Sequence, residues 1–207
     1  MAKIAILDYG AGNLFSLKSA LERNGAESVS IIYDLANLAE HDGLLLPGVG
    51  NFDPAIRSIE GSAQHLGAAI ATGMPVMGIC LGMEMLFNKS EEGNLEGLKI
   101  LDGEVVMLPK GKVKIPHMGW NNLQIRGNSV LLKGVKDKSW VYFVHSYRAA
   151  PSDRKIVVAT SDYGGSFPAV IERDNLIGVQ FHPEKSGDVG AIIIKNFIAM
   201  CDDNDAK

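Results

Sequence analysis

The sequence has few of the residues that mark secreted, membrane-spanning or metal-binding proteins. Only two cysteines, Cys80 and Cys201, occur in 207 residues, and their spacing fits neither a set of metal ligands nor a disulfide framework. No apolar run approaches the ~20 residues that a membrane span needs. The apolar run at the N-terminus stops at Asp8, which is too early for a signal peptide. We therefore expect a cytoplasmic protein in a reducing compartment, without a metal or cofactor.

Positive charge is also in short supply. The formal net charge is -4, which argues against a nucleic-acid-binding protein, because such proteins are usually basic. Hydrophobic residues make up 46% of the chain and charged residues 21%, values typical of a globular protein with a substantial core. The length favours one domain, which would span residues 1–207.

Apolar runs alternate with helical patterns in the first half of the chain. Buried strands are predicted at 3–7, 28–32, 43–46 and 75–79. Helices are predicted at 13–24, 62–72 and 81–87, with Asn13 as the N-cap of the first one. Strands that alternate with helices imply right-handed crossovers and a mostly parallel sheet with helices on both faces.

The pattern changes after residue 89, where strand-like stretches dominate. Strands are predicted at 100–108, 121–125, 140–144, 156–160, 169–172 and 177–181. The segment 173–175 reads as a hairpin turn, and a closing helix is predicted at 189–200. The predicted fold class is therefore α/β: a doubly wound, mostly parallel sheet that carries an antiparallel β insertion.

Cys80 lies in "GICLG", residues 78–82, at a predicted junction of strand and helix. The pattern Gly-x-nucleophile-x-Gly at such a junction indicates a nucleophile elbow, where larger side chains at the two glycine positions would clash. The following helix would offer its positive N-terminal end to the sulfur and favour the thiolate. Cys201 has no such surroundings and is predicted to be a packing thiol on the closing helix.

A nucleophilic cysteine needs a base, and His182 ends the predicted strand 177–181. Glu184 follows two residues later, and in an extended chain residues i and i+2 face the same side. Glu184 could therefore hold one ring nitrogen while the other takes the thiol proton, which predicts a Cys-His-Glu triad. Taken alone, His182 could equally be a structural histidine beside a surface glutamate.

Acyl transfer also needs donors for an oxyanion. The N–H of Leu81, directly after the nucleophile, is the first candidate. The second is the turn 47–50, where Val49 and Gly50 could present a backbone N–H. Glu84 lies four residues after Cys80 and would share its face of the predicted helix, close to the site.

Taken together, "PGVG", "GICLGM" and "QFHPEKSG" resemble the signatures of the class I glutamine amidotransferases, over the whole chain. The stretches 8–16, 47–55, 116–122 and 142–149 resemble the glutaminase subunits of imidazole glycerol phosphate synthase. This resemblance implies a flavodoxin-like fold and hydrolysis of glutamine through a thioester on Cys80. It also implies a heterodimer, in which ammonia passes through a tunnel to a (βα)8-barrel cyclase. That cyclase makes imidazole glycerol phosphate and aminoimidazole carboxamide ribonucleotide for histidine biosynthesis.

The resemblance implies roles for individual residues. The glutamine site would contain Gly48, Gly50, Glu84, Glu92, Ser146 and Tyr147. The cyclase interface would contain Asn13, Met118, Trp120, Tyr142 and Lys185. Glu92 would take the α-ammonium of glutamine. The family usually has glutamine where this chain has Glu84, and we hypothesise that Glu84 shares the ammonium with Glu92.

Three other functions remain open on the sequence. A triad glutaminase could serve another synthase, such as that of pyridoxal phosphate or anthranilate synthesis, although "PHMGWN" argues against it. A γ-glutamyl hydrolase or cysteine peptidase would act alone. A regulatory binding module would not need the triad.

Overall fold

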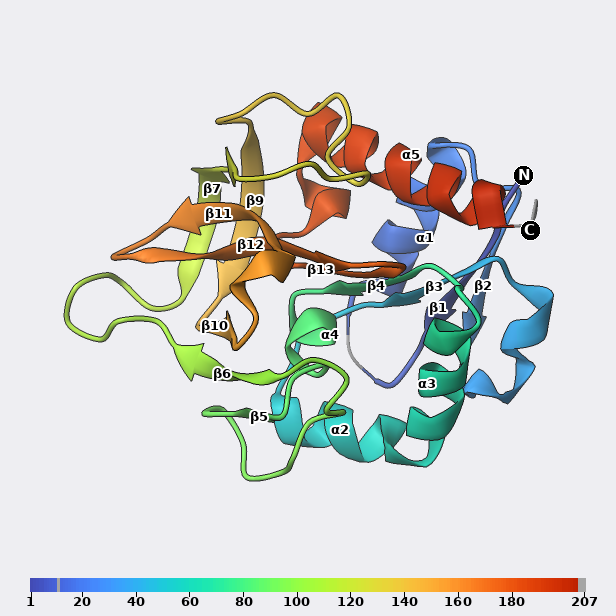
Figure 1. Cartoon of the computed structure of the whole chain (residues 1–207), viewed down its shortest axis with the longest axis horizontal. Coiled ribbons are helices and arrows are strands. Elements are labelled where there is room, and N and C mark those ends of the chain that lie inside the picture. The colour runs from blue at the N-terminus through green and yellow to red at the C-terminus, as the bar shows by residue number, and fades with distance from the viewer. Residues whose placement is uncertain (11, 205–207) are drawn as a thin grey trace.

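The computed structural model describes residues 1–10 and 12–204 and is built around one eight-stranded sheet (Figure 1). In spatial order the strands are β2 (Ser28–Ile32), β1 (Lys3–Leu7), β3 (Gly43–Leu46), β4 (Val76–Ile79), β13 (Leu176–Val179), β12 (Ser166–Arg173), β11 (Val157–Asp162) and β8 (Gln124–Ile125). Neighbours from β2 to β13 pair in parallel, and those from β13 to β8 pair antiparallel. The predicted α/β class with its antiparallel insertion is confirmed.

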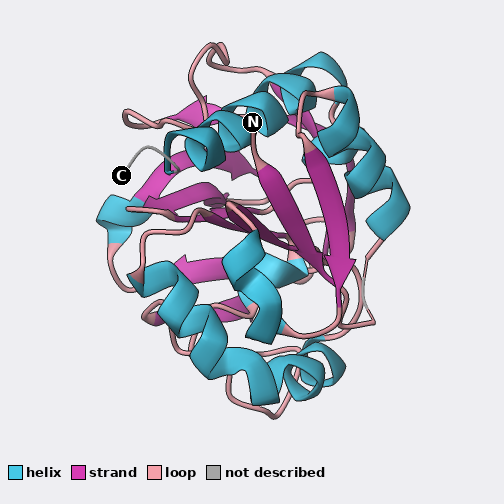
Figure 2. Cartoon of the chain, turned by 90° about the vertical axis from the view of Figure 1, so that its right-hand side faces the viewer, coloured by secondary structure: helices cyan, strands magenta, loops and turns pink. Residues whose placement is uncertain are grey.

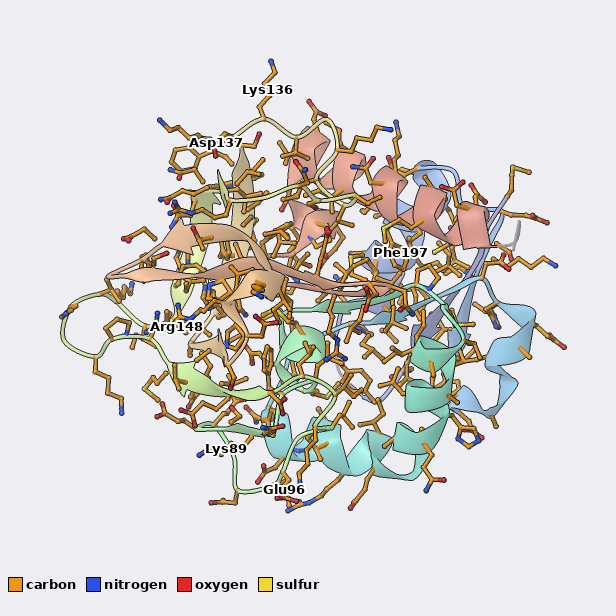
Figure 3. The ribbon with its side chains drawn as sticks, in the orientation of Figure 1. Lys89, Glu96, Lys136, Asp137, Arg148 and Phe197 are labelled. Atoms are coloured by element: carbon orange, nitrogen blue, oxygen red, sulfur yellow. The ribbon has the colours of Figure 1, made fainter. Side chains whose placement is uncertain are left out.

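Helices cover both faces of this sheet. Figure 2 shows the sheet between two helical layers, with α1 (Leu14–Arg23) and α5 (Gly187–Asn204) in one layer and α2 (Phe52–Ile59) and α3 (Ala63–Ala71) in the other. Side chains alternate along a strand, so Ile4 and Ile6 join the core under α1 and α5, whereas Ala5 and Leu7 join the core on the opposite face. Phe197 points from α5 toward the sheet (Figure 3).

Most predicted elements of the first half are present with small changes at their ends. Asn13 caps α1, because its Oδ1 accepts a hydrogen bond from the Ser16 N–H at 3.2 Å. The helix predicted at 81–87 is shorter and contains only α4 (Leu81–Glu84). Helix α2 was not predicted. Short 3-10 helices lie at Leu35–Glu40, Glu60–Ser62 and Arg154–Ile156.

The second half contains two small sheets beside the large one. Strand β6 (Gly103–Met107) pairs with β5 (Lys89–Ser90) and β10 (Tyr147–Pro151), and β7 (His117–Asn122) pairs with β9 (Trp140–His145). The strand predicted at 121–125 is wrong as a single element, because its residues divide between β7 and β8. The hairpin at 173–175 is confirmed, since Arg173 pairs with Leu176 across the turn. Strands β5 and β10 were not predicted. Figure 3 shows Lys136 projecting outward from the loop between β8 and β9.

The carboxyl ends of β1, β3, β4 and β13 meet at one edge of the sheet, because these strands run parallel. The segments that follow them carry most of the predicted site residues, as expected for an open α/β sheet. The stretch 8–16, one of those on which the resemblance rests, includes Ala11, which lies outside the described residues. In the part of the chain that the structure describes, no helix has the length and apolar character to cross a membrane.

Candidate active site

Cys80 lies on the tight turn between β4 and α4. Its φ is 52°, in the left-handed region that non-glycine residues rarely adopt. A Cβ added at Gly82 would collide with the carbonyl oxygen of Leu46, and one at Gly78 would lie 2.6 Å from the carbonyl oxygen of Gly82. The two glycines are therefore required by the close approach of backbone on either side of Cys80. This is the geometry that the elbow prediction describes.

His182 reaches the same edge from the neighbouring strand. The N–H of Cys80 donates to Val179 O at 2.7 Å, so β4 and β13 stay paired up to the elbow. Three residues after Val179, His182 Nδ1 lies 2.9 Å from Glu184 Oε1, and both side chains are buried. His182 Nε2 is buried and has no partner among the described residues. It is the ring nitrogen available for a thiol proton.

The connection between His182 and Glu184 differs from the prediction. His182 is extended, with φ -101° and ψ 100°, but Glu184 belongs to the 3-10 turn η4 (Pro183–Lys185). The expectation that an extended chain brings the two side chains together is therefore wrong, and a tight turn does so instead. Ser186 holds this turn, because its hydroxyl donates to His182 O at 2.6 Å and accepts from the Tyr142 N–H at 3.0 Å.

A cavity of about 320 Å³ opens beside Cys80, a size suited to a small ligand. It brings together residues predicted for the oxyanion hole and the glutamine site: Gly48, Val49, Gly50, Leu81, Glu84, Glu92, Ser146 and Tyr147. Sequence reasoning missed its other lining residues: Asn51, Pro116, Val144 and His145. A second cavity of about 10 Å³ touches His182, Glu184 and Asn13, and Gly48 and Val49 line both cavities.

The thiol is protonated in its resting surroundings. Burial raises the pKa of Cys80 well above its usual range, and the Glu84 carboxyl raises it further. Hydrogen bonds from Gln180 and from the Leu81 N–H oppose this rise in pKa without reversing it. The Cys80 Sγ lies 3.7 Å from Val144 O, to which it donates. The N-terminal end of α4 (four residues long) favours the thiolate, as predicted, only through the Leu81 N–H, and burial outweighs this effect on the Cys80 pKa.

Glu84 and Glu92 face the cavity in different states. Glu84 is 4% exposed, and burial raises its pKa to about 8 despite a hydrogen bond from Gln180. Glu92 is partly exposed, and its Oε2 accepts from the Phe52 N–H at 3.0 Å. Burial raises the pKa of Glu92 too, but this hydrogen bond opposes the rise. Near neutral pH Glu84 is therefore mainly protonated, which argues against its sharing an ammonium with Glu92.

Two further histidines brace the wall of the cavity. His145 Nδ1 donates to Tyr147 O at 2.7 Å, so its Nε2 must accept the hydrogen bond from His117 Nδ1 at 2.9 Å. His117 Nε2 then accepts from Asn121 at 3.4 Å. Burial lowers the pKa of His117 to about 4 and that of His145 to about 3. Both rings are thus neutral and fixed, and neither has a ring nitrogen free to act as the base.

The residues predicted for a partner interface form one surface. Trp120 pairs with Tyr142 across β7 and β9, their ring centroids 5.9 Å apart, and Met118 lies two residues along β7 on the same face. Met118 and Trp120 are 64% and 52% exposed. A Cβ added at Gly187, two residues beyond the exposed Lys185, would lie 4.0 Å from the Trp120 ring. Helix α1, which Asn13 caps, contacts η4.

Comparisons with known proteins identify the family of the chain. The family model for class I glutamine amidotransferases matches residues 5–201. Two relatives bear the name imidazole glycerol phosphate synthase subunit HisH. The one from Caldanaerobacter subterraneus is 48% identical and covers 95% of this chain and 98% of its own. The one from Aquifex aeolicus is 46% identical, and the match covers 94% of this chain and 95% of its own.

The chain belongs to the class I glutamine amidotransferases, among the HisH subunits. Solved structures of amidotransferases share its fold. A putative GMP synthase subunit from Thermoplasma acidophilum has a TM-score of 0.77 at 20% identity, covering 100% of this chain and 96% of its own. The glutaminase domain of a Trypanosoma brucei CTPS with bound acivicin has a TM-score of 0.71 at 19% identity. This match covers 98% of this chain and 94% of its own. At such identities the likeness bears on fold alone. Among the described residues of this chain, no group of three or more His, Cys, Asp or Glu side chains is arranged for a metal ion.

Proposed function

We propose that residues 1–207 form one glutaminase domain that hydrolyses glutamine to glutamate and ammonia through Cys80, His182 and Glu184. One observation carries the proposal. The strained Cys80 elbow and the His182–Glu184 pair end two neighbouring parallel strands, at the edge where a cavity of about 320 Å³ opens. A nucleophile with room for an amino acid thus lies at the same edge of the sheet as a base with its orienting carboxylate, which line the adjoining smaller cavity.

The chemistry follows from the hydrogen bonds of the resting site. Because the thiol is protonated, its proton moves to His182 Nε2 as Cys80 Sγ attacks the amide carbon of glutamine. Glu184, 2.9 Å from Nδ1, stabilises the imidazolium that forms. His182 then protonates the amide nitrogen, the C–N bond breaks to release ammonia, and water hydrolyses the thioester to glutamate. In the bound substrate, Glu92 receives the α-ammonium, and Ser146 and Tyr147 line the same cavity.

The oxyanion is stabilised by the N–H of Leu81 and by a backbone N–H from Val49 or Gly50. Gly50 has a φ of 135°, and Val49 is 39% exposed at the wall between the two cavities. A rotation of this peptide would change which groups face the substrate, and binding of a partner over Val49 could control it.

The partner we propose is a (βα)8-barrel cyclase, with which the chain forms a cytoplasmic heterodimer and to which ammonia passes without release to solvent. The relatives are named as subunits of imidazole glycerol phosphate synthase, which supports a role in histidine biosynthesis. The surface of Met118, Trp120, Tyr142, Lys185 and Asn13 supports a docking site beside the small cavity over His182.

The test is glutamate release from glutamine by the purified chain, alone and with a matched cyclase and its nucleotide ligand. Cys80→Ala is the control. We expect strong stimulation by the liganded cyclase and none in the control. Equal rates with and without the cyclase would refute the proposed partner, and activity that persists in Cys80→Ala would refute the proposed nucleophile.

A further inference from the structure

Gln180 joins Glu84 to the sulfur of Cys80. Its Nε2 donates to Glu84 Oε1 at 2.9 Å and to Cys80 Sγ at 3.6 Å. Gln180 has no exposed surface, and its backbone N–H donates to Ala169 O at 3.0 Å, which fixes it to β12. One buried amide therefore sets the position of both the carboxyl and the thiol.

Glu84 has no compensating cation in the part of the chain that the structure describes. Among the described residues, no Lys, Arg or terminal ammonium forms an ion pair with it, and its nearest donor is a neutral amide. The titratable groups around Glu84 on the neighbouring elements are acids or histidines. They are Cys80 before α4, Tyr9 after β1, Glu92 after β5, His145 on β9, Tyr147 on β10, and the pair His182–Glu184 at η4. A buried carboxylate without a cation is unfavourable, whereas the protonated acid is not.

Two polar atoms near Glu84 also lack partners. Gln180 Oε1 and Tyr9 Oη are buried and have no hydrogen bond within the described residues. Burial raises the pKa of the Tyr9 phenol, and both Cys80 and Glu84 raise it further, which places Tyr9 near both groups. A protonated Glu84 adds a hydrogen-bond donor to a cluster that contains an unpaired acceptor.

We propose that Glu84 is a positioning residue that acts as a protonated acid, letting Gln180 hold the Cys80 sulfur with no negative charge beside it. Ionisation of Glu84 would place a charge next to the sulfur and suppress the thiolate. The raised pKa of Glu84, about 8, agrees with this role. The inference rests on the proposed function only in taking Cys80 as the nucleophile.

The main test measures alkylation of Cys80 by iodoacetamide as a function of pH, in the full chain carrying Cys201→Ala so that one thiol reacts. In the parent chain Glu84 ionises before Cys80 and raises the midpoint of thiolate formation. Glu84→Gln keeps an amide of the same shape and removes the charge, so the midpoint should fall by about one pH unit. Glu92→Gln is the matched control, and should move the midpoint less, because the Glu92 charge does not act on the sulfur. Equal midpoints in the parent and Glu84→Gln would overturn the proposal.

A second measurement keeps the proposal testable if the sulfur reacts poorly. The infrared carbonyl band of a protonated carboxylic acid is compared between the parent chain and Glu84→Gln, about two pH units below and above the Glu84 pKa. We expect a band in the parent at the lower pH that disappears at the higher pH and is absent from the variant. A parent without that band at the lower pH would overturn the proposal. Neither measurement uses glutamine turnover, so failure of the proposed glutaminase activity would be seen separately.

Discussion

The surroundings of the two cysteines show what separates a reactive thiol from a packing thiol in this molecule. Both are buried, Cys80 at 6% exposed and Cys201 at 0%, and burial is the largest cause that raises the pKa of each. Cys201 packs against β3, where a Cβ on Gly43 would collide with its Sγ, and it joins the apolar core. Cys80 instead has a cavity, an amide donor and the neighbouring His182–Glu184 pair. Burial and thiol pKa therefore do not identify the nucleophile, whereas a proton acceptor and space for a substrate do.

The largest contrast is expected when each thiol is removed. Cys80→Ala should lower the kcat of glutamate release in the cyclase complex by at least ~10³-fold, since no other group can form the thioester. Cys201→Ala should leave kcat within about twofold, because it lies outside the site. Initial rates measured on the two variants side by side test this. Comparable losses in both would remove the distinction between the two thiols.

The next contrast concerns Glu184, the carboxylate that holds His182. Glu184→Gln should lower kcat by about 10³-fold, because an amide cannot stabilise the His182 imidazolium as a carboxylate does. Glu104→Gln removes an exposed carboxylate that pairs with Lys89 and should leave kcat almost unchanged. The ratio of the two rates is the measurement. A Glu184→Gln enzyme with parental kcat would remove Glu184 from the mechanism.

The glycines at the elbow should differ from a glycine elsewhere in their effect on stability. Gly82→Ala forces a Cβ into Leu46 O and should lower the free energy of unfolding by about 2 kcal/mol or more. Gly67→Ala lies in α3 with no atom within 4 Å of the added Cβ. It should raise the free energy of unfolding by about 0.5–1 kcal/mol, because alanine favours helix over glycine. Urea unfolding of both variants measures the difference, and a neutral Gly82→Ala would contradict the packing described for the elbow.

The smallest expected effect is on pH dependence. The pKa of Glu84 is raised to about 8, so Glu84 is neutral below that pH and charged above it. If the neutral acid is the productive form, kcat/KM for glutamine falls several-fold as pH rises through that value, and Glu84→Gln removes the fall. If Glu84 must be charged to hold the α-ammonium, kcat/KM rises there instead. Whether kcat/KM falls or rises through the Glu84 pKa therefore decides whether Glu84 acts as a neutral acid or as a charged ligand of the α-ammonium.

The features that could be predicted from the sequence are those with local signals. Alternating runs indicated the strands and helices of the first half, and Gly78, Cys80 and Gly82 indicated the elbow. Helix α2 had a signal that was not used: Phe52, Ala55, Ile56 and Ile59 follow helical spacing and are buried, and Pro54 is tolerated in a first turn.

Other features depend on contacts between distant parts of the chain. Strand β10 pairs with β6, and the paired residues are 40 to 48 positions apart in sequence. Gln180 lies 100 residues from Cys80 in sequence and 96 from Glu84, so the hydrogen bonds that join these three side chains have no local pattern. The turn that brings Glu184 to His182 is local. The sequence does not distinguish it from an extended segment, because either conformation can bring the two side chains together. These features could be obtained only once the fold was known.

Every step of the proposed chemistry depends on Cys80 as the nucleophile of a glutamine site. The most direct measurement treats the chain, with its cyclase present, with an electrophilic glutamine analogue and locates the adduct by peptide mass. We expect one adduct, on Cys80, that excess glutamine prevents, with Cys201 unmodified. Absence of an adduct on Cys80, or labelling that glutamine does not prevent, would contradict the proposed chemistry.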